Sequence, residues 1–446
     1  MQSEVYKYLR FAEFKSIFQW DLKRYLNKSF KSKYSIVELG AHIKDESKKY
    51  AISEEGKQYG ILGVNNQTGI FDAYTEDGSK IKQKYKRMET GWIAYNPYRV
   101  NVGSIGIKKP EHKFEYISPA YVVFGCLPSL SPDYLFLVMK TPVFNKIIRD
   151  NTTGSVRQNL SYDVLKSLQI PLPTIDDQQV LVKAYNDRIQ QAELLEKQAD
   201  QVGKEIEEYL LKELGINGQN KTVNSQNSRF KFLRFIRFKD ANRWDAYNCE
   251  PEAILKLKQS NFPLVEIGKA YNFIKRSWDK KEKEFRYVEI GSVDALNGIL
   301  YAEEMPTSKA PSRATQKIKT KDLIIGTTRP YLKKFAIVNQ DFNDCVCSSG
   351  FQVIAPNETN NISFLYEYLK TSPAIAQFEL FMTGALYPAI TNKDLRKVLI
   401  PLPTLEIQNT IVEHINKQKT QIKELKKQAE ELRKEALEEF EKEVFE

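Results

Sequence analysis

Nearly the whole of this sequence is present twice, and this internal repeat constrains the fold more than any other feature. The segment TGSVRQNLSYDVLKSLQIPLPT, residues 153–174, returns as TGALYPAITNKDLRKVLIPLPT, residues 383–404. The starts of the two halves also match, because Arg10-Phe11 corresponds to Arg234-Phe235. The offset between the copies grows only from 224 to 230 residues, which indicates short loop insertions between common elements. The period is too long for a solenoid, so we expect two similar globules related by an approximate internal twofold axis.

The first part of each copy mixes strand-like runs with brief helical patterns. The runs YVVF (121–124), RYVEIG (286–291) and DLIIGTT (322–328) are rich in β-branched and aromatic residues and are bounded by Gly, Pro and Asn. The segment SFLYEYLKTSP (363–373) has helical spacing. This mixture predicts an α+β fold in which each copy forms an α/β globular domain.

The second part of each copy has the pattern of a long helix. Proline in Pro-Leu-Pro favours an extended approach, after which Thr174 or Thr404 can cap a helix with acidic residues in its first turn. Apolar residues then follow at alternating steps of four and three, which is a coiled-coil seam, and Arg188 and Gln418 each take one polar slot. The predicted coiled-coil interface consists of Leu181, Tyr185, Ala192, Leu195, Ala199, Val202, Ile206, Ile411, Ile415, Ile422, Leu425, Ala429, Leu432 and Ala436.

Two such seams in one chain can satisfy each other, so we expect the two helices to pair antiparallel and to separate the globules. About 38 residues at ~1.5 Å per residue span roughly 57 Å, which is longer than one globule is wide. The alternative is an amphipathic helix packed on its own domain. The expected division is residues 1–174 and 229–404 for the globular domains, 175–214 and 405–446 for the helices, and 215–228, rich in Gly, Asn and Ser, for a linker.

The charge distribution indicates a polyanionic partner. The chain has a net charge of +10. Residues 176–214 carry 5 basic and 10 acidic side chains, and residues 406–446 carry 8 and 11, so these helical segments amount to −5 and −3. The rest of the chain therefore carries +18, and a nucleic acid would bind there.

The sequence has no pattern that predicts catalysis. It lacks a phosphate-binding loop, a zinc-protease pair and a nucleophile elbow. Its four cysteines and three histidines have no metal-binding spacing, so we expect no metal and no cofactor. Asn96-Pro97-Tyr98 resembles the Asn-Pro-Pro-Tyr loop of amino-methyltransferases, but it lacks the second proline, and its counterpart in the repeat, Arg329-Pro330-Tyr331, keeps only Pro-Tyr. We therefore expect a binding protein without catalytic residues.

No apolar run approaches the ~18 residues that a membrane span needs, and charged residues stand where a signal peptide would be apolar. We therefore expect a cytoplasmic protein that does not bind membranes.

Basic residues interleaved with aromatic ones mark the candidate DNA contacts. Such stretches occur at residues 96–99, 229–244, 275–287 and 327–335. Lys and Arg neutralise phosphates, and Arg, Asn and Gln can bond to base edges in the major groove. The stretch RFKFLRFIRF equally suits a half-buried strand, whereas Pro330 favours a loop, and loops on a rigid globule carry recognition. The candidate DNA-binding residues are Asn96, Tyr98, Arg99, Arg157 and Gln158 in the first copy and Arg329, Tyr331, Lys333, Lys334 and Tyr387 in the second.

Each globule ends in Ile-Pro-Leu-Pro, followed by an acidic residue, glutamine (Asp177-Gln178; Glu406-Ile407-Gln408) and a heptad helix. This twofold pattern resembles the DNA specificity subunit of type I restriction-modification systems over essentially the whole chain. The resemblance implies that each globule is a target recognition domain that reads one half of a split site in double-stranded DNA. It also implies that the helices are a spacer, that two methyltransferase (modification) subunits dock alongside, and that a nuclease-translocase (restriction) subunit joins for cleavage.

Two alternatives stay open at this point. One is a stand-alone adenine DNA methyltransferase with attached recognition domains. The other is a coiled-coil scaffold without a DNA role, which the excess of +18 outside the helices disfavours.

Overall fold

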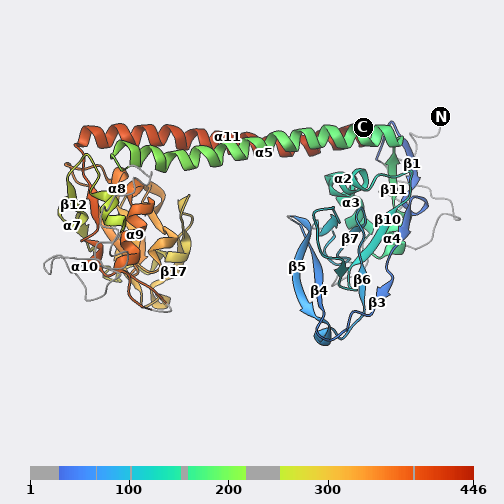
Figure 1. The fold of residues 1–446 in the computed structure, drawn as a ribbon, viewed down its shortest axis with the longest axis horizontal. Coiled ribbons are helices and arrows are strands. Elements are labelled where there is room, and N and C mark those ends of the chain that lie inside the picture. The colour runs from blue at the N-terminus through green and yellow to red at the C-terminus, as the bar shows by residue number, and fades with distance from the viewer. Residues whose placement is uncertain (1–29, 67, 101–102, 152–158, 217–251, 385–386) are drawn as a thin grey trace, which may run out of the picture. The chain divides into compact units, whose positions relative to one another are not determined.

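The computed structural model describes residues 30–66, 68–100, 103–151, 159–216, 252–384 and 387–446 (Figure 1). Its contacts divide the chain into two compact units. The first comprises the residues up to Glu196 together with Lys426–Glu446, and the second comprises Lys197–Leu425. Each long helix therefore contributes one end to each unit.

The first unit contains an antiparallel four-stranded sheet with the strand order β2-β10-β7-β8. Its strands are β2 (Ile43–Asp45), β10 (Val122–Cys126), β7 (Ile93–Tyr95) and β8 (Ile105–Ile107). A second sheet has the order β3-β6-β9-β4-β5, in which only the β4–β9 pair is parallel. Its strands are β3 (Lys49–Tyr50), β6 (Tyr85–Arg87), β9 (Tyr116–Ile117), β4 (Gln58–Asn65) and β5 (Gly69–Asp77). Further elements are β1 (Ser35–Glu38), which pairs with β11 (Gln169–Leu172), and helices α2 (Pro132–Lys140), α3 (Pro142–Asn151) and α4 (Tyr162–Ser167).

The second unit repeats this plan. Its antiparallel sheet has the order β13-β22-β19-β20, formed by β13 (Asn272–Ile274), β22 (Phe351–Ala355), β19 (Leu323–Gly326) and β20 (Phe335–Ile337). The other sheet has the order β17-β14-β21-β18, formed by β17 (Glu303–Pro306), β14 (Glu284–Val288), β21 (Val346–Ser348) and β18 (Ala314–Lys317). Two strand pairs complete it: β12 (Leu264–Glu266) with β23 (Leu399–Pro401), and β15 (Val293–Asp294) with β16 (Gly298–Ile299). The short helices are α6 (Glu252–Leu257), α7 (Ile267–Ala270), α8 (Ile362–Leu369), α9 (Ser372–Phe381) and α10 (Asn392–Leu395).

The strand registers confirm the α+β fold and the internal repeat. Ile93 pairs with Phe124 in the first unit, and Leu323 pairs with Ile354 in the second, so both partners are shifted by 230 residues. The predicted strand at residues 121–124 is β10, the one at 322–328 is β19, and the predicted helix at 363–373 begins as α8.

The two long helices are α5 (Ile175–Glu213) and α11 (Leu405–Phe445), of 39 and 41 residues. Thr174 caps α5 as predicted, because its Oγ accepts the Asp177 N–H at 3.2 Å and donates to the Asp177 carboxylate at 2.7 Å. Among the described residues none of these helices is long and apolar enough to cross a membrane.

A fully buried glutamine fixes the start of each long helix. The Gln178 amide oxygen accepts the N–H of Ser131, the N-cap of α2, at 2.7 Å, while its amide nitrogen donates to Pro173 O at 3.0 Å. Gln408 does the same in the second unit, with Asn361, the N-cap of α8, at 2.8 Å and with Pro403 O at 2.9 Å. The glutamine after Pro-Leu-Pro thus ties the helix start to the globule by bonds that are shielded from water.

The far ends of the long helices are part of the globule cores. In the first unit, Phe440 and Val444 of α11 belong to the same buried cluster as the core strands β7 and β10. In the second unit, Leu210 of α5 and Leu214, which directly follows that helix, lie at the equivalent positions 230 residues earlier and belong to the cluster around β19 and α9. The long helix of each copy therefore completes the core of the other copy's globule.

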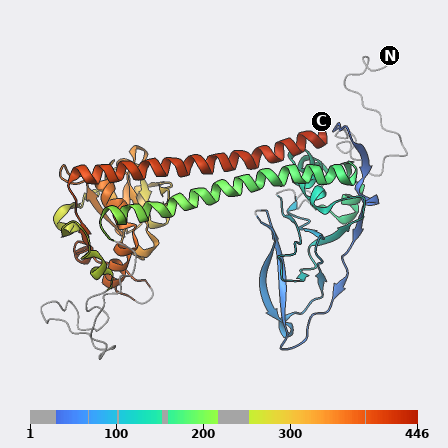
Figure 2. The same cartoon turned by 45° about the horizontal axis from the view of Figure 1, so that its top comes forward.

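Within each unit the ends of α5 and α11 lie side by side and antiparallel (Figures 1 and 2). In the first unit Tyr185 packs on Phe440, and Arg433 forms an ion pair with Glu196 at 2.9 Å, so rising numbers in α5 meet falling numbers in α11. Of the two predicted polar slots, Arg188 pairs with Glu439, whereas Gln418 Oε1 has no partner among the described residues.

All fourteen predicted seam residues are buried or half-buried. The seam alanines Ala192, Ala199, Ala429 and Ala436 are the most enclosed of those between the helices. Toward the helix ends the seam joins the globules, since Tyr185 packs on the first core and Ile411 and Ile415 lie inside the second. The two expected arrangements, helix on helix and helix on domain, therefore occur along the same helices.

Candidate nucleic-acid interface

The β19–β20 loop of the second unit, residues 327–334, is rigidly anchored. The Thr327 backbone N–H and hydroxyl both donate to Gly350 O at 2.9 Å, and Gly326 N donates to Lys334 O at the same distance. Arg329 and Lys333 have left-handed backbone conformations, with φ of 49° and 53°. Such conformations are unfavourable for residues with a Cβ and persist only where the surroundings enforce them.

A second loop, formed by the repeated Thr-Gly segment, meets the first. Arg329 N donates to Pro388 O at 2.7 Å, and the Arg329 guanidinium lies 5.3 Å from the centre of the Tyr387 ring. Gly384 has φ of +103°, a conformation that explains the glycine of this motif. The structure thus brings together Arg329 and Tyr387, which the sequence proposed from separate segments. Tyr387 is 72% exposed and Tyr331 is 38% exposed.

Lys333 and Lys334 are half-buried, and the charge of Lys333 acts on a lysine that sequence reasoning missed. Lys370, at the end of α8, donates to the Tyr366 hydroxyl at 2.7 Å. Burial lowers the pKa of Lys370 to about 8. Glu367 and Asp294 oppose this shift, whereas the charges of Lys419 and Lys333 add to it. No local pattern separates Lys370 from the other lysines of the sequence.

The equivalent β7–β8 loop of the first unit, residues 96–104, presents Tyr98 and Arg99. Tyr98 is 55% exposed and Arg99 is also exposed. Asn96 is half-buried, and its side-chain oxygen accepts the Tyr98 N–H at 3.0 Å, so this asparagine shapes the turn. Arg157 and Gln158, the other two candidates, lie outside the described residues.

The hydrogen bonds correct the sequence pairing of these two loops. Leu160 N donates to Pro97 O, and Ile390 N donates to Thr327 O, both at 3.0 Å and exactly one repeat apart. Arg99 is therefore the counterpart of Arg329, and the pairing of Asn96-Pro97-Tyr98 with Arg329-Pro330-Tyr331 was wrong by three residues. The sequence pairing relied on the Pro-Tyr dipeptide that both loops contain. The hydrogen bonds instead place Pro97 at the position of Thr327, so the two Pro-Tyr dipeptides are not equivalent.

Arg276 and two aromatic side chains of the next basic stretch have structural roles in the part of the chain that the structure describes. In residues 275–287, Arg276 forms a bidentate ion pair with buried Asp322, and Trp278 packs on Phe285 with ring centres 4.2 Å apart. These side chains stabilise the domain. Residues 229–244 lie outside the described residues.

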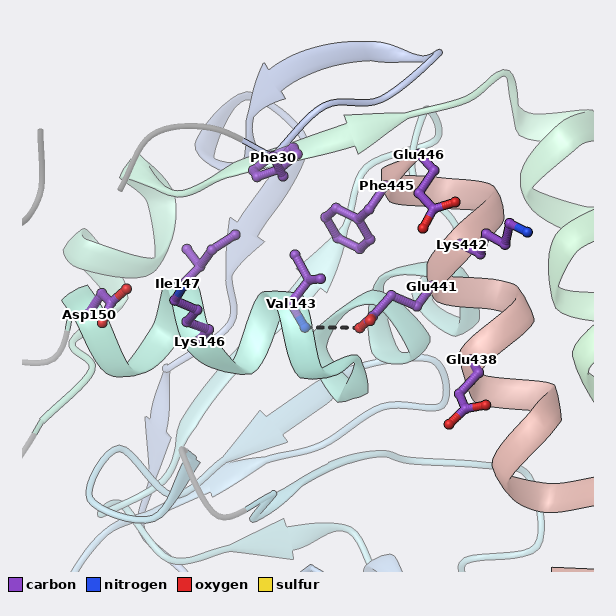
Figure 3. Close-up of a pocket in the computed structure, with 10 residues that line it drawn as sticks. All are labelled: Phe30, Val143, Lys146, Ile147, Asp150, Glu438, Glu441, Lys442, Phe445 and Glu446. Carbon is purple, nitrogen blue, oxygen red and sulfur yellow. Dashed lines mark hydrogen bonds between the residues drawn. The ribbon is translucent and has the colours of Figure 1, made fainter. Parts of the chain in front are cut away.

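A cavity of about 440 Å³ lies between α3 and the C-terminal end of α11 in the first unit (Figure 3). Glu441 reaches from α11 to accept the Val143 N–H at 2.9 Å, as the dashed line in Figure 3 shows. The acidic lining residues are Asp150, Glu438, Glu441 and Glu446, against the basic residues Lys146 and Lys442. An excess of carboxylates disfavours DNA, so we do not include this cavity in the interface.

The cysteine, histidine and acidic side chains of the described residues were the candidates for redox and metal chemistry. No group of three or more His, Cys, Asp or Glu side chains among them is placed to hold a metal ion. Cys345 and Cys347 are buried, and burial raises the pKa of the Cys347 thiol to about 12. A thiol with such a pKa is not a nucleophile at neutral pH.

Comparisons with known proteins converge on one family. The model for the type I restriction modification DNA specificity domain matches residues 261–434. The putative type I restriction enzyme MjaX specificity subunit of Methanocaldococcus jannaschii is 23% identical over 309 residues, which cover 67% of this chain and 66% of that protein. The type I restriction enzyme HindI specificity subunit of Haemophilus influenzae is 26% identical over 132 residues, or 29% of each chain. The chain thus spans slightly less than two thirds of the first relative and under a third of the second.

A solved structure supports the fold. A chain from a study of complex assembly and conformational transition of the type I R-M system covers 93% of this chain with 98% of its own length, at a TM-score of 0.55 and 15% sequence identity. At this identity the likeness shows a shared fold.

Proposed function

Because this chain belongs to the type I restriction-modification DNA specificity family, we propose that it reads an interrupted site in double-stranded DNA, one half with each globule. In this proposal the chain contributes recognition and no catalysis. It directs two methyltransferase subunits, and restriction subunits through them, to the site in the cytoplasm.

One observation carries the proposal. The β7–β8 and β19–β20 loops have the same anchoring bonds, since Asn96 N donates to Ser104 O and Gly326 N donates to Lys334 O one repeat later. The side chains on these matching backbones differ. A common scaffold with different loop side chains is what a protein needs to read two different half-sites.

The candidate contacts follow from the loop geometry. Arg329 and Tyr387 support each other across two loops, and Arg99 stands at the position equivalent to Arg329. We assign base readout to the two arginines, because an arginine can donate two bonds to a guanine edge. We assign phosphate contact to Lys333 and Lys334 and stacking or backbone contact to the exposed tyrosines.

We assign the spacer role to α5 and α11. The 39 residues of α5 at ~1.5 Å each correspond to roughly 58 Å of continuous helix. The division into domains at residues 1–174, 175–214, 215–228, 229–404 and 405–446 belongs to this proposal. The exposed, acid-rich sides of the helices are unsuited to DNA and are available for protein subunits.

The test is a map of modified adenines in host DNA with and without this gene. We expect a motif of two short sequences separated by a fixed unread gap, and its loss when the gene is deleted. An unchanged map, or a lost motif without a gap, would contradict the proposal. Purified chain incubated with DNA and a labelled methyl donor should incorporate no label until methyltransferase subunits are added, and incorporation by the chain alone would show that it is itself an enzyme.

A further inference from the structure

A pocket of about 250 Å³ lies in the second unit at the base of the β19–β20 loop. Ser349 and Asn392 are among its lining residues. Gly350, which follows Ser349, accepts the two hydrogen bonds from Thr327, and Ile390, two residues before Asn392, donates to Thr327 O at 3.0 Å. The pocket therefore shares its walls with the segments that hold the candidate reading loop in place.

The lining of this pocket suits an anion. Lys275 and Arg396 supply positive charge, and none of the ten described residues that line the pocket carries a carboxylate. The hydroxyl and amide groups come from Thr315, Gln316, Ser349, Gln352 and Asn392. The cavity beside α11 in Figure 3 differs in this respect, because four carboxylates line it.

Arg396 is held in place by two contacts. Its guanidinium lies 4.4 Å from the centre of the Phe273 ring, and its Nε donates to the Asn392 side-chain oxygen at 2.9 Å. These contacts fix the plane of the guanidinium while its two terminal amines remain as donors. An arginine oriented in this way is suited to bind two oxygens of a phosphate group.

The first unit has different chemistry at the equivalent place. Phe273 pairs with Ile354 in the second unit, and Asp45 pairs with Phe124 in the first, so Asp45 stands where Phe273 supports Arg396. Glu46 follows it at the position of Ile274. Lys166, at the position of Arg396, forms an ion pair with Asp163 at 3.0 Å, and Glu46 pairs with Lys44 at the same distance. Two carboxylates thus replace two apolar residues, and this part of the first unit is less favourable for an anion than the pocket of the second.

We propose that the pocket lined by Lys275 and Arg396 binds one phosphate of the DNA backbone, beside the bases that the β19–β20 loop reads. The first unit makes no corresponding contact. This inference rests on the proposed DNA-binding function and adds a positioning contact that is independent of base sequence.

The experiment uses the full chain and two duplexes, one with the mapped target and one unrelated, between 50 and 200 mM salt. The double variant Lys275→Gln/Arg396→Gln should bind both duplexes more weakly by the same factor. Its plot of log affinity against log salt should be shallower by about 0.9, the value for one phosphate, although two charges are removed. The ratio of the wild-type affinity to the variant affinity should therefore fall about 3.5-fold over this fourfold salt range.

Two controls separate the pocket from general charge and folding effects. The variant Lys212→Gln/Lys423→Gln removes two exposed charges from α5 and α11 in the same unit and should retain the wild-type slope. The variant Lys275→Arg/Arg396→Lys keeps both charges and should also retain it.

The proposal for the pocket is overturned if the affinity of the wild type depends on salt and the Lys275→Gln/Arg396→Gln variant has the same slope. That result would leave the proposed DNA-binding function intact. It is also overturned if the loss is confined to the target duplex, because the pocket would then read a base. If the wild type has no salt-dependent affinity for either duplex, the proposed function itself fails, and the pocket assignment fails with it.

Discussion

Arg329 combines an unfavourable backbone conformation with a fixed side chain. A left-handed conformation costs a residue other than glycine ~1–3 kcal/mol, and here the hydrogen bond to Pro388 O and the anchored ends of the loop enforce it. Strain of this kind is concentrated at binding sites, where it positions a side chain in advance. Lys333, at the position of Gly103 in the other copy, has the same conformation, which Gly103 adopts with φ of +86°.

These two residues should respond differently to substitution. Arg329→Ala should relax the preference for one base pair by ~1–3 kcal/mol and change the affinity for unrelated DNA little. Lys333→Gly, which relieves the backbone strain while removing the charge, should weaken binding to all sequences alike and reduce the salt slope by about one. Competition with singly substituted duplexes measures both effects. An Arg329→Ala variant with the wild-type preference at every base pair would exclude Arg329 from readout.

At the scale of the elements, the start of each long helix depends on one buried amide. Gln178 and Gln408 each satisfy the N-cap N–H of a neighbouring helix and a carbonyl of the Pro-Leu-Pro segment. Removing the amide leaves these buried groups without partners, which costs more than the bonds themselves contribute.

Gln408→Leu should therefore lower the free energy of unfolding of the second unit by ~1–3 kcal/mol. Hydrogen exchange should locate the loss at the start of α8, whose first N–H groups depend on Gln408 and Asn361. Gln421→Leu, at an exposed position of α11, is the matched control and should change stability little. Equal losses in the two variants would show that the buried bonds are unimportant.

Periodicity and repetition predicted the elements well and their partners less well. Short runs rich in β-branched and aromatic residues predicted β10 and β19, and Thr174 predicted the start of α5, because these signals depend on neighbours in the sequence. The pairing of Arg99 with Arg329 could not be read from the letters, because it depends on bonds between segments about 60 residues apart. The buried hydrogen bonds of Gln178 could not be predicted from the sequence either, since glutamine is usually an exposed residue.

At the scale of the whole molecule, the two copies exchange their helix ends. Leu210 and Phe440 are apolar residues of the long helices, but a heptad pattern does not indicate which globule's core each side chain enters. Their contacts indicate that the last turns of the chain stabilise its first domain, and that neither globule has a complete core from its own copy alone.

Phe440→Ala should destabilise the first unit by ~3–5 kcal/mol, through lost apolar contact and the cavity left behind. Hydrogen exchange should show reduced protection in β7 and β10 and unchanged protection in β19 and β22. Leu210→Ala is the mirror-image variant, for which the affected strands should be β19 and β22. Loss of protection in the second unit after Phe440→Ala would contradict the exchange of helix ends.

The central claim is that α5 and α11 set the separation between two half-site readers. The most direct measurement is a methylation map from a variant with one heptad inserted after Glu196 in α5 and one before Lys426 in α11, where each helix passes from one unit to the other. Seven residues add ~10.5 Å of helix, or about three base pairs of DNA. We predict that both half-site sequences stay unchanged while the gap between them grows by about three base pairs. An unchanged gap, or altered half-sites at the original gap, would contradict the claim.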